Sequence, residues 1–197
     1  MTDEGTIDNI IKTNNGMITT AEAVKSGISR PMFYEYVKDN ELKLVSRGIY
    51  ATADAWIDDM YVLHIQYPDA VFSHEESLYY SGFTDREPLQ HIMTVKTGYN
   101  PWRMKEKGIK VYTVKQEMLS VGKIYHKDNY GFMIPIYDKE RTICDIVRSR
   151  SYIEIQDYQS AIKAYSSCED KDITKLMHYA TLFHVDRIIR QYMDVML

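Results

Sequence analysis

The apolar residues of the first 55 positions recur three and four residues apart, which predicts short amphipathic helices that share one small core. After these helices, apolar and polar residues alternate from Leu42, and the chain turns at Ser46-Arg47-Gly48 into a second short apolar run. This alternation is typical of a two-stranded hairpin with Arg47 at its tip. The residues expected in the core are Ile7, Ile10, Ile11, Ala23, Val24, Ile28, Phe33, Tyr36 and Val37.

Capping signals set the expected helix boundaries. Thr19 and Glu22 have the T-x-x-E spacing of a capping box, so we expect a helix to begin directly after Thr19. Gly27 suits the left-handed position that ends a helix, and Ser29 or Arg30 can cap the next one. Two short helices joined by a glycine-containing turn, followed by a hairpin, predict a winged helix-turn-helix over residues 1–55.

A module of this kind places its second helix against DNA. The outward residues of that helix are expected to be Arg30, Met32, Tyr34, Glu35 and Lys38. The expected DNA-binding residues are Ser29, Arg30, Tyr34, Lys38, Lys43 and Arg47. The alternative is a small helical subdomain that contacts only protein, and charge favours it: residues 1–55 carry six Lys and Arg against eight Asp and Glu, a net charge of −2.

The remaining residues, 56–197, predict a second domain, so the whole chain is expected to be α+β. We expect a helix over 54–67, a strand over 70–72, and a helix capped by Ser73 with Glu76 at the capping-box position and Gly82 at its end. A small mixed or antiparallel sheet is expected within about 70–137, from strands at 89–95, 109–114, 118–125 and 132–137. A helical bundle is expected over about 139–197, with helices at 141–150, 155–166, 173–182 and 185–197.

Basic residues gather in one stretch of the second domain. Between Thr94 and Lys127 there are eight Lys and Arg against two Glu, a net charge of +6, and the aromatic residues Tyr99, Trp102, Tyr112 and Tyr125 lie among them. The pattern fits a second nucleic-acid surface, and it fits equally well lysines that keep exposed sheet edges soluble and unpaired. The residues expected on such a surface are Lys96, Arg103, Lys105, Lys107, Lys110 and Lys115.

Composition narrows the function classes. The 197-residue chain has a formal net charge of −4, which excludes a general polyanion binder. Two cysteines, Cys144 and Cys168, are too few for a disulfide framework or a zinc site. The acidic N-terminus and the absence of a long apolar run predict a cytoplasmic protein that does not span a membrane.

Three segments, taken in order, resemble one known family. They are SRGIY at 46–50, SHEESLYYSGF at 73–83 and DKERTICDI at 138–146. With the helix-turn-helix, they make the chain similar over nearly its full length to the AbiEi-type antitoxins of type IV toxin–antitoxin, or abortive infection, systems.

The resemblance implies a winged helix-turn-helix that binds inverted repeats in its own promoter and represses the operon. It also implies a C-terminal domain that counteracts a nucleotidyltransferase toxin, without a stable complex with it. The recognition helix would fall on Arg30 to Asn40 and the wing on Leu42 to Ala51. The motif positions of the C-terminal domain would be Asp138, Glu140, Arg141, Thr142 and Asp145, with no implied role. From the residues themselves, we expect Asp138 to cap a helix in which Arg141 pairs with Asp145 at i, i+4.

Enzyme functions find little support. The E-x-K patterns at Glu41 and Glu169 lie in the expected wing and at a helical junction, so neither predicts a nuclease metal site. Ser73-His74-Glu75 brings together three catalytic residue types, but adjacent residues on one backbone point apart. No phosphate-binding glycine loop is present, so we expect no cofactor and no catalytic residue. Two other functions stay open: a plain winged-helix regulator, and a protein-interaction module that binds the toxin directly.

Overall fold

The computed structural model describes residues 3–128 and 131–196, and it is an α+β protein with about 49% helix and small sheets. The chain divides into two compact units, Met1–Gln66 and Tyr67–Leu197. The division therefore falls later than the boundary expected at 55/56. One reason is a hydrogen bond from Gln66 Nε2 to Ser46 Oγ (2.6 Å). It connects the helix that ends at Gln66 to the first unit.

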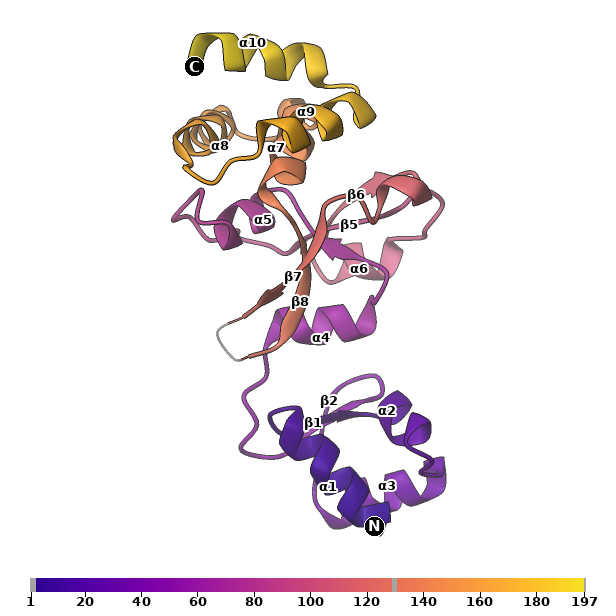
Figure 1. The fold of residues 1–197 in the computed structure, drawn as a ribbon. Helices are drawn as coiled ribbons and strands as arrows, with labels where there is room; N and C mark the ends of the chain where they lie inside the picture. The colour runs from indigo at the N-terminus through magenta and orange to yellow at the C-terminus, as the bar shows by residue number, and fades with distance from the viewer. Residues whose placement is uncertain (1–2, 129–130, 197) are drawn as a thin grey trace. The chain divides into compact units, whose positions relative to one another are not determined.

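The first unit is built from four helices and three short strands (Figure 1). In chain order these are α1 (Asp3–Thr13), β1 (Met17–Thr19), α2 (Thr20–Lys25), α3 (Arg30–Asp39), β2 (Lys43–Ser46), β3 (Ile49–Ala51) and α4 (Asp59–Gln66). The strands form one antiparallel sheet in the order β1-β3-β2. The hairpin expected from the sequence is present, but it is part of a three-stranded sheet because Met17–Thr19 pairs with β3.

The capping signals act as expected. Glu22 N–H donates to Thr19 Oγ1 (3.0 Å) and Thr19 N–H donates to Glu22 Oε2 (2.9 Å), which completes the capping box of α2. Gly27 has φ +89°, a conformation that glycine adopts without a Cβ clash. Ser29 is the cap of α3, since its Oγ accepts from Met32 N–H (3.4 Å).

The core of the first unit joins α1, α2, α3 and the sheet. Its buried residues are Ile7, Ile11, Ile18, Ala23, Ile28, Phe33 and Leu42. Two predictions are wrong here: Val24 is 44% exposed, and Met32 packs against the core instead of facing outward. The helix expected over 54–67 is also shorter, because Asp58 Oδ1 accepts from Tyr61 N–H (2.7 Å) and sets the start of α4, leaving Trp56 66% exposed.

The second unit has a mixed five-stranded sheet, as the sequence predicts. Its strands are β4 (Val71–Phe72), β5 (Ile92–Lys96), β6 (Lys110–Val114), β7 (Lys123–Lys127) and β8 (Met133–Tyr137), in the order β6-β5-β4-β8-β7. Pairs β5–β6 and β4–β8 are parallel, and the others are antiparallel.

Two strand boundaries differ from the prediction. Leu89 lies outside β5 and is 95% exposed. The strand expected over 118–125 is instead a 3-10 turn at Gln116–Met118 followed by β7. The reason is tertiary: the carbonyl oxygens of Met118 and Val121 accept hydrogen bonds from the Arg141 side chain, so they do not pair with a strand.

Within the described residues, six α-helices accompany this sheet. They are α5 (Glu75–Tyr80), α6 (Trp102–Glu106), α7 (Lys139–Arg148), α8 (Ile155–Ser167), α9 (Ile173–Leu182) and α10 (Asp186–Met196). The last four gather beyond one end of the sheet, which agrees with the expected helical tail (Figure 1). Helix α7 begins at Lys139, ahead of the expected Arg141, because Asp138 Oδ1 caps it by accepting from Arg141 N–H (2.8 Å).

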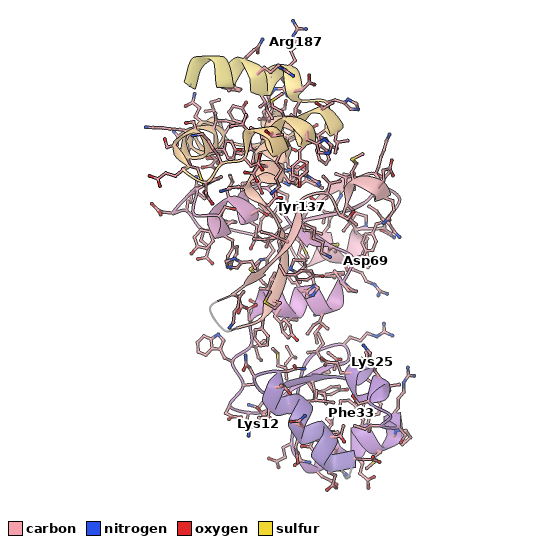
Figure 2. All side chains as sticks on the ribbon, in the orientation of Figure 1. Lys12, Lys25, Phe33, Asp69, Tyr137 and Arg187 are labelled. Carbon is pink, nitrogen blue, oxygen red and sulfur yellow. The ribbon has the colours of Figure 1, made fainter. Side chains whose placement is uncertain are left out.

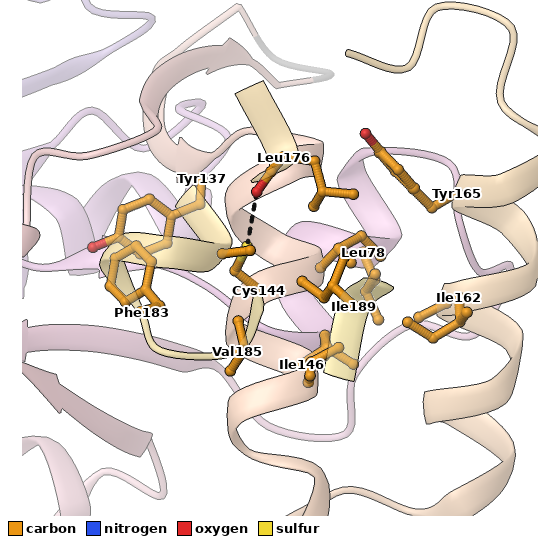
Figure 3. Packing of buried hydrophobic residues seen from close by; sticks show 14 of the residues in the cluster. Leu78, Tyr137, Cys144, Ile146, Ile162, Tyr165, Leu176, Phe183, Val185 and Ile189 are labelled. Atoms are coloured by element: carbon orange, nitrogen blue, oxygen red, sulfur yellow. Dashed lines mark hydrogen bonds between the residues drawn. The ribbon is translucent and has the colours of Figure 1, made fainter. Parts of the chain in front are cut away.

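The main core surrounds α7. Ile143, Cys144 and Ile146 of this helix pack with Leu176 of α9 and Ile162 of α8. Figure 3 shows the side chains of Cys144, Ile146, Ile162 and Leu176 converging, with the Cys144 thiol near the Leu176 carbonyl (3.8 Å). Burial raises the pKa of Cys144 far above its usual value, so this thiol is an inert part of the core.

Candidate nucleic-acid interface

A row of exposed side chains follows one face of α3. Arg30, Tyr34 and Lys38 are spaced at i, i+4 and i+8, so they lie above one another along the helix. All three are exposed, as is the cap Ser29, while Phe33 is fully buried on the opposite side. We call Arg30, Tyr34 and Lys38 the α3 row.

Tyr34 is held in place by aromatic neighbours. Its ring lies 6.3 Å from that of Tyr50 on β3 and 5.7 Å from that of Phe33, measured between centroids. Burial raises the pKa of Tyr50, and the neighbouring Tyr34 hydroxyl raises it further. Tyr34 is still 47% exposed, so the ring is both oriented and accessible.

The two hairpin cations, Lys43 and Arg47, lie in different places on the hairpin. Tyr50 pairs with Leu44 across the strands, and Lys43 pairs with Ala51. Because neighbouring strand residues point to opposite faces, Leu44 shares the face of Tyr50 and Lys43 points away from it. Leu44 is 64% exposed, and Arg47 is exposed in the turn between the strands. The structure therefore places Leu44 on the face of the α3 row and Lys43 on the other face.

Among the described residues of the first unit, the basic side chains are not neutralised by ion pairs, whereas some of the acidic side chains accept hydrogen bonds within the fold. Within the described residues, 3–128 and 131–196, no ion pair involves the side chains of Lys12, Lys25 or any of the other four bases of this unit. Figure 2 labels Lys12 and Lys25 on different sides of the unit. Several acids are engaged instead: Glu22 in the capping box, and Asp8 as acceptor from the Tyr36 hydroxyl.

The basic stretch of the second unit is not one surface. Lys96 lies at the end of β5, Arg103 and Lys105 lie on α6, and Lys107 directly follows α6; all four are exposed. Lys110 and Lys115 lie on and just after the edge strand β6, and Lys110 Nζ is paired with Glu75 Oε1 (2.9 Å). Lys123 and Lys127 lie on β7, at the opposite edge of the sheet. The sheet order thus separates residues that are close in the sequence.

The motif residues after β8 form a buried polar centre. Arg141 is completely buried, and its Nε donates to Asp145 Oδ2 (2.9 Å), which confirms the expected i, i+4 pair. The guanidinium lies between the rings of Tyr137 and Phe183, at 3.9 and 4.0 Å from their centroids. Burial raises the pKa of Asp145, and Arg141 opposes that shift.

The other two motif acids connect α7 to α9. Lys175 Nζ lies 2.9 Å from Asp138 Oδ2 and 3.2 Å from Glu140 Oε2, and its pKa is raised by these contacts against the opposing effect of burial. Glu140 Oε1 also accepts from Asp172 N–H (3.1 Å). Every one of the four residues Asp138, Glu140, Arg141 and Asp145 is buried and bonded within the fold, so the motif holds the sheet and the helices together.

The turn between β4 and α5 contradicts the predicted cap. Ser73 Oγ bonds the ring of His74 (3.0 Å) and accepts from the Thr94 hydroxyl (2.8 Å), so it does not cap α5. Glu76 likewise closes no capping box, since its Oε2 accepts from Ile92 N–H (3.0 Å). His74 occupies the cap position with φ +56° and ψ −125°, a strained conformation for a residue with a Cβ.

His74 is almost completely buried and fully bonded. Its Nδ1 lies 3.0 Å from Ser73 Oγ and its Nε2 lies 3.0 Å from Ser149 Oγ, while its ring stacks on Tyr112 at 3.5 Å. Burial lowers the pKa of His74 well below 6.5, and Lys110 and Arg141 lower it further. The imidazole is therefore neutral in the folded protein.

The sequence does not predict two of these features. The first is the position of Leu44 and Tyr50 on the α3 face, which depends on the hairpin register. The second is helix α6, which lies between two strands and buries a single residue, Met104. The signal that the sequence offers is Trp102 within a few residues of Arg103, Lys105 and Lys107.

No protein-family model and no curated protein sequence matches the chain. The crystal structure of the RV2827C protein from Mycobacterium tuberculosis is similar, with a TM-score of 0.57 and 13% identity over 89% of this chain and 70% of that chain. At this identity the similarity shows a shared fold alone. Among the described helices, none is long and apolar enough to cross a membrane.

Proposed function

We propose that the first unit is a winged helix-turn-helix that binds double-stranded DNA, with α3 as the recognition helix and the β2–β3 turn as the wing. The α3 row carries the proposal: Arg30, Tyr34 and Lys38 are exposed on one face of a helix whose start is fixed by a cap and whose opposite face is buried. A helix held in this way presents the same side chains to the major groove each time it docks.

The residues of the proposed DNA-binding surface suit different parts of the DNA. Arg30 in the first turn of α3 suits a guanine edge, where a guanidinium donates two hydrogen bonds. Tyr34 and Leu44 form an apolar surface that suits thymine methyl groups. Lys38 and Arg47 suit phosphates, which position the module without reading sequence.

A binding assay with the DNA upstream of the gene tests the proposal. Arg30→Ala is expected to weaken binding about 5- to 150-fold, the cost of about 1–3 kcal/mol for a lost base contact. Arg47→Ala is expected to weaken binding to all sequences alike and to lower the salt slope by about one. Lys12→Ala, which removes an exposed cation from α1, is the matched control and should change little. Full binding by both the Arg30 and the Arg47 variants would contradict the assignment of this surface.

We further propose that the chain is an antitoxin and autorepressor that counteracts a nucleotidyltransferase toxin. This proposal rests on the resemblance to AbiEi-type antitoxins in the three segments SRGIY, SHEESLYYSGF and DKERTICDI. Its test is co-expression with the product of the neighbouring gene: growth should be rescued by the full chain, and repression of a promoter fusion should need Arg30.

Two other functions give different results in the same experiment. Rescue accompanied by a stable complex of the two proteins would favour a module that binds the toxin directly. Promoter repression without any rescue would favour a plain winged-helix regulator. Rescue without a stable complex is the result that the proposal predicts.

A further inference from the structure

The connection between β5 and β6 carries an exposed aromatic ring among cations. This surface, which we call the α6 surface, consists of Lys96, Trp102, Arg103, Lys105, Lys107 and the adjacent Tyr67. Trp102 is 59% exposed at the start of α6, and Met104, two residues later, is fully buried beneath the helix. The buried methionine fixes the helix on the sheet, so the tryptophan is held outward.

The cations are arranged around the rings. Lys107 Nζ lies 6.0 Å from the centroid of the Tyr67 ring. Burial and the neighbouring Tyr99 raise the pKa of Tyr67, whereas the positive charge of Arg103 lowers it. Arg103 and Lys107 are four residues apart and so flank the same side of the helix, while Lys105 lies three residues from Trp102.

The α6 surface also carries a local excess of positive charge. Residues 96–107 contain four Lys and Arg and one acid, Glu106, whereas the second unit as a whole has equal numbers, 18 of each. In the described part of the chain, Lys96, Arg103 and Lys105 form no ion pair. Their charge is therefore available to a polyanion.

We propose that the α6 surface binds a single-stranded stretch of nucleic acid. Trp102 stacks on an unpaired base, and Lys96, Arg103 and Lys105 contact the flanking phosphates. A base within a duplex has both faces covered by its neighbours, so an outward indole finds a stacking partner only where bases are unpaired. This surface belongs to the second unit and acts independently of the duplex binding proposed for the first.

Tryptophan fluorescence provides a direct test, because the chain has only two tryptophans. In a Trp56→Phe variant, Trp102 is the sole tryptophan, and its emission is followed with excitation at the red edge of the indole band, where tyrosine does not absorb. Trp56 is 66% exposed, so its replacement is expected to leave the fold intact. The probes are the oligonucleotides dT20 and rU20, a 20-base-pair duplex annealed from two complementary strands, and inorganic polyphosphate. Saturable quenching by dT20 or rU20, but not by the duplex or polyphosphate, is expected. Absent quenching, or equal quenching by polyphosphate, would overturn the proposal.

Variants then separate stacking from charge in an anisotropy assay with labelled dT20. Trp102→Leu is expected to weaken binding at least about fivefold, and Trp102→Phe to retain most of it, because phenylalanine keeps a flat ring. The double change Arg103→Gln, Lys105→Gln is expected to flatten the salt slope by about 1.4, since each single-strand phosphate contact contributes about 0.7. Glu106→Gln is expected to tighten binding, and Lys163→Gln on α8 is the matched control that should not alter it.

The same assay separates this proposal from that for the first unit. In a chain carrying Arg30→Ala and Arg47→Ala, the quenching by dT20 should persist while binding to the promoter duplex is lost. Loss of quenching in that chain would place the single-strand site on the first unit and overturn the assignment to α6.

Discussion

Replacing Arg141 by methionine is expected to destabilise the second unit by about 3–5 kcal/mol, because it removes the cation that is hydrogen-bonded to the buried Asp145 carboxylate. Asp145 is 2% exposed, and its Oδ2 accepts from Arg141 Nε at 2.9 Å. Methionine has a similar apolar length and can still lie between the rings of Tyr137 and Phe183, so little of the loss comes from a cavity.

The loss of stability in Arg141→Met has a second contribution, which does not depend on the charge of Asp145. Arg141 Nη1 donates to the carbonyl oxygens of Met118 (2.8 Å) and Val121 (2.6 Å), and both lose a donor in the variant. Adding Asp145→Leu should therefore recover only the electrostatic part, with a coupling energy of about 1–3 kcal/mol in a double-mutant cycle. In thermal unfolding, the single change should lower Tm by roughly 12–20 °C for a unit of this size.

The assay is urea unfolding of the full chain followed by far-UV circular dichroism, with hydrogen exchange in α7 reporting on the second unit alone. Burial raises the folded-state pKa of Asp145, so its contribution to stability is greatest below its unfolded-state pKa and is lost as the pH rises. Without Arg141 this shift grows, and the Arg141→Met defect should be smaller near pH 4 than at pH 7. A loss below about 1 kcal/mol, or an equal loss when Asp145 is leucine, would refute the assignment of a charged buried pair.

Lys43→Ala is expected to weaken duplex binding less than Arg47→Ala, because Lys43 points to the far face of the hairpin; anisotropy with the promoter fragment compares them directly. Burial first, and then nearby cations, lower the pKa of His74, so the free energy of unfolding should fall as the pH drops below about 6.5, by up to about 1.4 kcal/mol per pH unit. His74→Gln should remove that slope in urea titrations. Gly122→Ala should cost more than about 1 kcal/mol in the same titrations, because Gly122 has φ +72° and the added Cβ would lie 2.5 Å from Arg141 Cβ.

Signals with a local backbone mechanism were predictable from the sequence. Thr19, Gly27 and Ser29 act within three residues of themselves, so the pattern alone places the ends of α2 and α3. Ser73 has the same kind of pattern but does not cap α5. Its hydroxyl takes a partner from β5, Thr94, which is distant in the sequence, and the strained turn at His74 removes it from the helix end.

Surfaces were less predictable than helix ends, because they depend on register and strand order. The bases from Lys96 to Lys127 form one run in the sequence, yet β6 and β7 lie at opposite edges of the sheet. The motif acids show the converse: Asp138 and Glu140 could be recognised as a group, but their common partner, Lys175, lies on α9 and has no signal of its own.

The charge of the first unit determines how the proposed duplex binding would work. The unit has six Lys and Arg against ten Asp and Glu, so its long-range field does not attract a polyanion. Binding must depend on close contacts of Arg30, Lys38 and Arg47, and the two phosphate contacts proposed for Lys38 and Arg47 would give a salt slope of only about −1.8. With so little non-specific affinity, the module would distinguish sites through the base contacts of Arg30 and Tyr34. A measured slope steeper than about −5 would contradict this argument, because it would require more cations than the α3 face and the wing provide.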